Sequence, residues 1–147
     1  MKKIVLILTL ITSLASCSRN AANDNSVTPQ KETDCVEVIY FHGKQRCLSC
    51  RAIEKFSRET VDSAFHDELN NGTVVYKVVD ITTPEGEALA DRYEVAGSSL
   101  FISKRKDGKE TKCDMTGSGF RNARKHTDIF KREVAGQIHE YLKQLQL

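Results

Sequence analysis

Two cysteines separated by two residues, Cys47 and Cys50, form the part of this chain best suited to chemistry. Thiols at this spacing can close into one small disulfide. A strand-like run over residues 36–41 precedes the pair, and a helix-like run over residues 50–69 follows it. At such a junction Cys47 would lie beside the first unpaired N–H groups of the helix, where partial positive charge favours a thiolate. Because the thiolate is the reactive form of cysteine, this pattern is typical of thiol–disulfide exchange.

Three nearby side chains are candidates for tuning the pair. Arg46 and Arg51 would add positive charge beside a thiolate and stabilise it further. His42 could pass a proton to or from Cys50. Simpler interpretations stay open for each of them: the arginines as solubilising surface charge, and the histidine as a solvated loop residue.

The cysteine pair also has other interpretations. It could form a structural disulfide in a binding domain without redox activity, or one half of a metal site. A zinc site usually needs a second Cys or His pair at regular spacing, and the sequence has none. His42 and Cys113 could complete a soft-metal or arsenite site if the fold brought them close. The expectation from the residues is a redox pair with no metal and no cofactor.

The first sixteen residues have the pattern of an export signal. Lys2 and Lys3 make a basic start, an apolar run follows, and small residues precede Cys17. This ending resembles the lipobox of bacterial lipoproteins, which implies that residues 1–16 are removed and that Cys17 is lipidated. Residues 17–34 are polar without an apolar period, so we interpret them as a flexible tether. Residues 35–147 would then form one domain.

Charge and cysteine content narrow the class of protein. Without Lys2 and Lys3, the 22 basic residues fall to 20, equal to the 20 acidic ones, so no nucleic-acid partner is expected.

An exported chain meets an oxidising compartment, where disulfides persist. Four cysteines besides Cys17 allow three pairings, and only the CxxC pairing follows from local spacing. We expect Cys35 and Cys113 to be unpaired or structural.

Apolar periodicity and turn residues predict an alternating chain. The predicted elements, in order, are a strand at 36–41, a helix at 50–69, a strand at 74–81, a helix at 84–92, strands at 100–104 and 109–115, and a helix from about 127. Gly72 would end the first helix, Thr83 would cap the second, Asp107 and Gly108 would form a hairpin turn, and Thr127 or Asp128 would cap the last helix. Residues 117–126 have no clear prediction. A strand–helix–strand start forces a parallel pair, so we expect an α/β fold with a mixed four-stranded sheet and helices on both faces.

This arrangement resembles the thioredoxin-like superfamily over residues 36–147. The specific parts are the CxxC after the first strand, the run 90–102 that leads into the third strand, and the hairpin turn at Asp107-Gly108-Lys109. Residues 40–43 and 52–54 are also similar to a group of short bacterial proteins, the ArsF family of nitrophenyl-compound nitroreductase subunits.

The superfamily resemblance implies roles for the cysteines. Cys47 would attack a partner's disulfide and Cys50 would resolve the mixed disulfide. The chain departs from the pattern at three points: Arg46 replaces the usual tryptophan, Leu48 and Ser49 replace Gly-Pro, and Ser99 replaces the cis-proline that faces the disulfide. Because a cis bond before a non-proline residue costs about 3 kcal/mol, we expect a trans Ser98–Ser99 peptide. The acid commonly buried behind the resolving cysteine has no evident counterpart on the first strand.

The partners implied are a protein carrying a thiol or disulfide and an electron donor that is exported or in the membrane. The lipid on Cys17 would anchor the chain in the cell envelope, at the periplasmic side or in the outer membrane.

Overall fold

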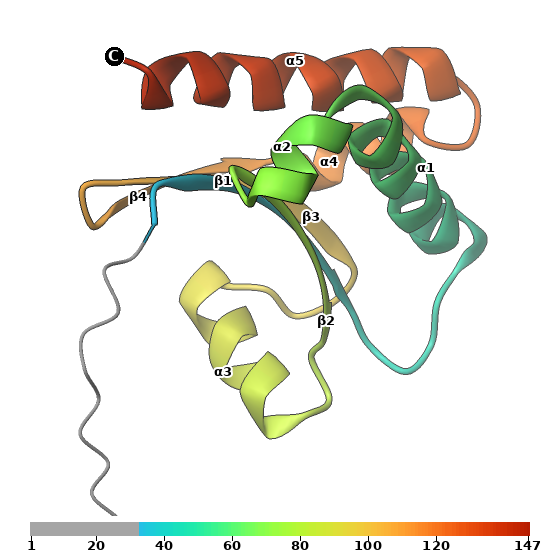
Figure 1. Ribbon diagram of the computed structural model, residues 1–147. Helices are drawn as coiled ribbons and strands as arrows, with labels where there is room; N and C mark the ends of the chain where they lie inside the picture. The colour runs from blue at the N-terminus through green and yellow to red at the C-terminus, as the bar shows by residue number, and fades with distance from the viewer. Residues whose placement is uncertain (1–32) are drawn as a thin grey trace, which may run out of the picture. The chain divides into compact units, whose positions relative to one another are not determined.

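The computed structural model describes residues 33–147 (Figure 1). The strands are β1 (Cys35–His42), β2 (Val74–Asp80), β3 (Ser99–Lys106) and β4 (Lys109–Asp114). The helices are α1 (Leu48–Ala64), α2 (His66–Asn71), α3 (Pro84–Tyr93), α4 (Thr116–Asn122) and α5 (Thr127–Leu145). The expected signal at residues 1–16, the lipidation at Cys17 and nearly all of the tether at 17–34 lie outside the described residues.

The strands form one sheet in the order β2-β1-β3-β4. β1 runs parallel to β2 and antiparallel to β3, and β3 and β4 form the hairpin. Every residue of the central strand β1 is buried, as its continuous apolar sequence predicted. The predicted α/β class and mixed four-stranded sheet are confirmed.

Helices cover both faces of this sheet, with α1, α2, α4 and α5 on one side and α3 on the other (Figure 1). Side chains alternate along β1, so Val36, Val38 and Tyr40 join the core under α1 and α5, whereas Ile39 and Phe41 pack with α3. The larger core therefore lies on the side that carries the start of α1.

Several of the predicted start and stop signals act as expected. The Thr83 hydroxyl accepts a 3.1 Å hydrogen bond from the Gly86 N–H at the start of α3. Gly72 ends α2 in the left-handed region, at φ 79°. Asp107 and Gly108 turn the hairpin with φ values of 51° and 71°, the backbone that a type I′ turn requires.

The helix predicted over residues 50–69 is two helices. α1 begins at Leu48 and ends at Ala64, and α2 begins at His66. Phe65 between them has φ −133° and is fully buried, with its ring 4.7 Å from that of His139 on α5. Leaving the helical conformation at Phe65 lets its ring enter the core, and this tertiary contact overrides the local helical pattern.

Residues 117–126, for which the sequence predicted no element, include most of α4. A Cβ added at Gly119 would lie 2.9 Å from the Ile53 side chain, so α4 packs closely on α1. The expected cap of the last helix at Thr127 or Asp128 is wrong. His126 is the N-cap and contributes no side-chain hydrogen bond there, and the Thr127 hydroxyl donates to the Ala123 carbonyl instead.

Candidate active site at the start of α1

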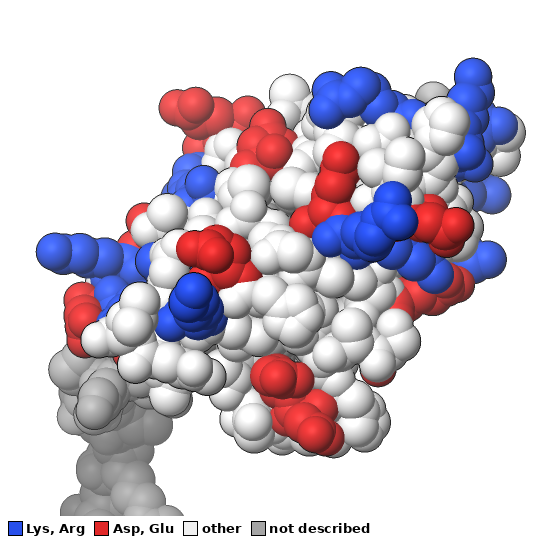
Figure 2. All heavy atoms as spheres, turned by 90° about the horizontal axis from the view of Figure 1, so that it is seen from above, with Lys and Arg blue, Asp and Glu red and all other residues white. Residues whose placement is uncertain are grey.

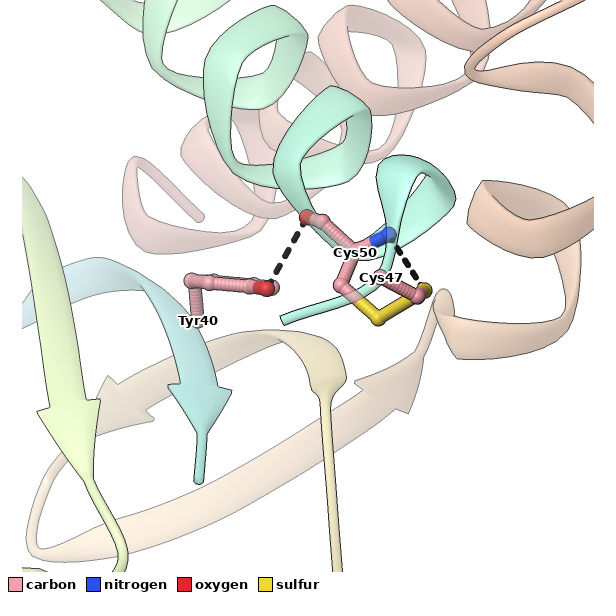
Figure 3. Close-up of a disulfide and its surroundings, with 3 residues drawn as sticks. All are labelled: Tyr40, Cys47 and Cys50. Atoms are coloured by element: carbon pink, nitrogen blue, oxygen red, sulfur yellow. Dashed lines mark hydrogen bonds between the residues drawn. A yellow bond between two sulfur atoms is a disulfide. The ribbon is translucent and has the colours of Figure 1, made fainter. Parts of the chain in front are cut away.

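Cys47 and Cys50 form a disulfide at the first turn of α1, with their Cα atoms 5.0 Å apart (Figure 3). Cys47 is the N-cap residue, and its backbone carbonyl accepts a 3.0 Å hydrogen bond from the Arg51 N–H. Its sulfur accepts another, 3.0 Å long, from the Cys50 N–H. The sulfur of Cys47 therefore occupies the position where cap side chains satisfy a free N–H at the positive end of a helix.

The two cysteines differ in access to solvent. Cys47 is exposed, whereas Cys50 is only 7% exposed. Leu48, the residue after Cys47, is 67% exposed and is an unusually open apolar side chain. A reacting group from outside can therefore approach Cys47, while Cys50 is shielded by the protein.

Tyr40 lies directly beneath this turn and was not anticipated as a site residue. Its side chain is fully buried, and its hydroxyl donates a 2.9 Å hydrogen bond to the Cys50 carbonyl (Figure 3). Burial raises the pKa of Tyr40, while a hydrogen bond with the Ser98 side chain opposes that change. The period-two alternation of β1 places Tyr40 on the α1 face near the strand's end, and this signal could have identified it.

The buried acid of β1 is Glu37, which lies on the opposite face from Tyr40 and toward the other end of the strand. Its carboxylate pairs with Lys77 at 2.5 Å and with Arg105 at 3.3 Å. Behind the first turn of α1 the structure has the neutral Tyr40 hydroxyl, and no buried acid bonds to Cys50 within the described chain.

The two arginines flanking the pair have different surroundings. Arg46 forms an ion pair with Glu54, on the second turn of α1, so part of its positive charge is compensated. Arg51 is exposed and takes part in no ion pair with residues 33–147. Of the two, Arg51 retains the less compensated charge near the disulfide.

His42 is the last residue of β1 and only 8% exposed, so its interpretation as a solvated loop residue is wrong. Its Nδ1 lies 3.1 Å from the Gly43 carbonyl oxygen. In the parallel pairing it is opposite Asp80, whose pKa is lowered mainly by hydrogen bonds from Thr82 and less by His42 itself. His42 thus lies at the carboxyl end of the central strand β1, where the chain leaves the sheet and continues to the disulfide.

Ser99 is the first residue of β3 and pairs with Phe41 near the same edge of the sheet. Its hydroxyl donates a long 3.4 Å hydrogen bond to the Gly97 carbonyl. No cis peptide bond occurs between residues 33 and 147, which confirms the expected trans Ser98–Ser99 peptide.

Cys35 and Cys113 are free thiols, as expected. They lie on β1 and β4, which β3 separates in the sheet. Burial raises the pKa of both thiols and so favours their unreactive protonated forms. Cys113 approaches the Met115 sulfur at 3.9 Å. Within the described part of the chain no three His, Cys, Asp or Glu residues gather as a metal site, so His42 and Cys113 do not complete one with the cysteine pair.

Comparisons with known proteins give similarity to solved structures only. No family model and no curated protein sequence matches the chain. A thioredoxin from Thermus thermophilus has 21% identity and a TM-score of 0.42, with 67% of this chain and 72% of that chain covered. A malarial protein has 18% identity and a TM-score of 0.38, with 56% of this chain and 82% of that chain covered. Among residues 33–147, no helix has the length and apolar character needed to span a bilayer.

Proposed function

We propose that this chain is a thiol–disulfide oxidoreductase whose redox pair is Cys47 and Cys50. The observation that carries the proposal is the exposed residue Cys47 at the N-cap of α1, whose sulfur is bonded to that of the shielded Cys50 and accepts the Cys50 N–H. In the reduced protein, the same N–H and the positive helix end favour a thiolate at Cys47. Cys50 has no comparable exposure and so is suited to the second, internal step.

The reaction proceeds by two exchanges. The Cys47 thiolate attacks one sulfur of a partner disulfide, forming a mixed disulfide and releasing the partner's other sulfur as a thiolate. Cys50 then loses its proton to solvent and attacks the Cys47 sulfur, which releases the partner's second thiolate. Two electrons pass to the partner, and the chain ends with the Cys47–Cys50 disulfide.

A second dithiol must return the oxidised chain to its reduced state. An electron-donor protein carrying two thiols does this by the same steps in reverse, with its own thiols becoming a disulfide. If the partner is instead a dithiol substrate, these reversed steps oxidise it. The exposed Cys47 is the point of attack in either direction.

Reduction of insulin disulfides by the full chain, with dithiothreitol as the electron source, tests the assignment. We expect activity above the dithiothreitol background and loss of that activity in Cys47→Ser. When dithiothreitol is removed before insulin is added, the reduced Cys50→Ser variant should accumulate a mixed disulfide. A Cys113→Ser variant is the control and should act like the wild type. Full activity in Cys47→Ser would refute the assigned roles.

The proposal extends to location: a lipid on Cys17 anchors the domain in the cell envelope, with residues 18–34 as the tether. The basic start, the apolar run and the terminal Cys support this. Expression with labelled palmitate in a bacterial host tests it. Label should enter the wild type and be absent from Cys17→Ser, and equal labelling of the two would contradict the anchor.

A further inference from the structure

A groove of about 320 Å³ runs between α1 and the edge strand β2, beginning one residue after Cys50. Its lining residues are Arg51, Glu54, Lys55, Arg58, Tyr76 and Val78. The outer edge of β2 has no strand beside it among the described residues, since β2 is the first strand of the sheet. The groove is therefore open to another molecule that approaches the redox pair.

One wall of the groove is a basic stripe along α1. Arg51, Lys55 and Arg58 follow Cys47 at intervals of four, four and three residues, the spacing that puts side chains on one helical face. The stripe thus starts beside the exposed residue Cys47 and continues for about three turns of the helix. Figure 2 shows basic side chains on both sides of the face seen from above, with acidic side chains among them.

The nearby carboxylates only partly compensate this stripe. Glu54, the one acidic residue that lines the groove, is engaged by Arg46. Lys55 has Glu59 at 3.8 Å, but Glu59 is closer to Lys131, at 2.8 Å.

Arg58 has Asp62 at 3.9 Å on the following turn, in an exposed i,i+4 pair that water and salt screen strongly. Since Arg51 has no ion-pair partner within residues 33–147, positive charge is in excess along the groove.

The floor of the groove is held in place by hydrogen bonds. The Tyr76 hydroxyl lies 2.8 Å from the Ser57 hydroxyl and donates to the Glu54 carbonyl at 3.1 Å. The guanidinium of Arg58 lies over the Tyr76 ring, 4.5 Å from its centroid. Val78 adds an apolar surface that is 44% exposed. The basic groups therefore surround a preformed surface, which reduces the entropy lost on binding.

We propose that this groove binds an acidic segment of the protein partner whose disulfide reacts with Cys47. The inference rests on the proposed function and adds the recognition of the partner. From Cys47 to Arg58 the helix rises about 16 Å, at about 1.5 Å per residue. An extended chain covers that distance in about five residues, so the partner's Asp or Glu residues lie within about five positions of its reacting cysteine.

Synthetic peptide disulfides test this proposal with the reduced full chain in uncharged detergent. Three peptides carry one cysteine followed by five residues that are acidic, lysine-rich or serine-rich, each joined to its own copy by a disulfide. The measured quantity is the second-order rate constant for oxidation of the chain, divided by that for the uncharged hydroxyethyl disulfide. Normalising to the small disulfide separates docking from the reactivity of Cys47.

At an ionic strength of about 0.01 M, the acidic peptide should react about tenfold or more faster than the serine peptide. At about 1 M salt, where the Debye length is about 3 Å, that advantage should largely disappear. The double variant Lys55→Glu with Arg58→Glu should abolish or reverse the preference. Lys109→Glu with Arg132→Glu changes the net charge equally at exposed sites outside the groove and should keep it.

The single variant Lys55→Gln replaces a side chain that is 65% exposed and tests the groove if the double variant does not fold. It should reduce the advantage of the acidic peptide by a few-fold.

Equal rates for the three peptides, or equal loss of preference in the groove and control variants, would overturn the proposal. Glutathione disulfide, a small anionic disulfide, is a further substrate for the same assay. If the chain preferred it but showed no preference for the acidic peptide, the proposal would also be overturned, and the groove would be assigned to a small anion. No reaction with hydroxyethyl disulfide would instead mean that the proposed redox function itself fails.

Discussion

The hydroxyl of Tyr40 donates a 2.9 Å hydrogen bond to the carbonyl oxygen of Cys50. This bond joins the end of the central strand to the first turn of α1, beside the disulfide (Figure 3). The strand itself is buried over its whole length, so the anchor point is rigid. The position of Cys50 is therefore set by the sheet as well as by its own helix.

Replacing Tyr40 with phenylalanine removes this bond, together with the hydrogen bond to the Ser98 side chain, and leaves the ring in the core. We expect Tyr40→Phe to lower the free energy of unfolding by about 0.5–1.5 kcal/mol, the usual net contribution of one such bond. Urea unfolding of the oxidised protein measures the loss. Tyr141→Phe is the control, because the Tyr141 hydroxyl makes no hydrogen bond in the described chain. Equal losses in both variants would show that the hydrogen bonds of the Tyr40 hydroxyl contribute nothing to stability.

The two cysteines of the reduced protein should differ in reactivity toward iodoacetamide. Cys47 is exposed and lies at a helix N-terminus, so it should be alkylated first, with an apparent pKa below the ordinary value of about 8.5. Cys50 is 7% exposed and should react much more slowly. Limited alkylation at several pH values, followed by mass spectrometry of peptides, distinguishes the sites. First reaction at Cys50 would contradict the assignment of Cys47 as the attacking thiol.

A methyl group at Gly86 would not fit the structure. The added Cβ would lie 1.9 Å from the Asp80 carbonyl oxygen, which is backbone and cannot move aside freely. Gly86→Ala should lower the free energy of unfolding by about 1–3 kcal/mol. Gly136→Ala is the matched control within α5: its Cβ meets nothing within 4 Å, and it should raise stability by about 0.5–1 kcal/mol. Similar effects of the two variants in urea would refute the close approach of α3 to β2.

Glu110 should make part of the stability depend on pH. Burial by itself raises the pKa of Glu110, but hydrogen bonds from Tyr93 and Ser103, with nearby positive charge, outweigh burial and leave the pKa below its ordinary value. A folded-state pKa below the unfolded one gives stability that is present above about pH 4.3 and lost as the pH falls through the folded-state pKa.

Urea unfolding at pH 7 and pH 3 measures this dependence. Glu110→Gln can still accept the hydroxyl bonds but cannot titrate, so its stability should fall less between the two pH values than that of the wild type. The exposed Glu94→Gln serves as the control and should keep the wild-type dependence. An unchanged dependence in Glu110→Gln would contradict this source of acid sensitivity.

Local signals in the sequence were enough for the order of the four strands and for the cysteine pair that forms the disulfide. An apolar run followed by CxxC and an amphipathic segment predicts a strand, a pair of thiols and a helix without knowledge of distant residues. The Thr83 cap, the Gly72 stop and the Asp107-Gly108 turn are also local, because each depends on the backbone preferences of one to four residues.

Elements that depend on distant contacts could not be predicted in this way. α4 contains two glycines and has no amphipathic pattern, yet it is helical and packs through Gly119 against Ile53. The break at Phe65 arises because the core accepts its ring only outside the helical conformation. Neither contact leaves a trace in the periodicity of the chain.

The sequence by itself determined that two thiols occur at the start of a helix after a buried strand, since spacing and periodicity are properties of neighbouring residues. Only the tertiary structure decided what surrounds them: Tyr40 beneath Cys50, Glu54 paired with Arg46, and a basic groove against β2. These groups meet because sheet order and helix packing bring together residues that are far apart in the chain. Hydrogen bonds and electrostatic interactions act over distances in space, whatever the separation in sequence.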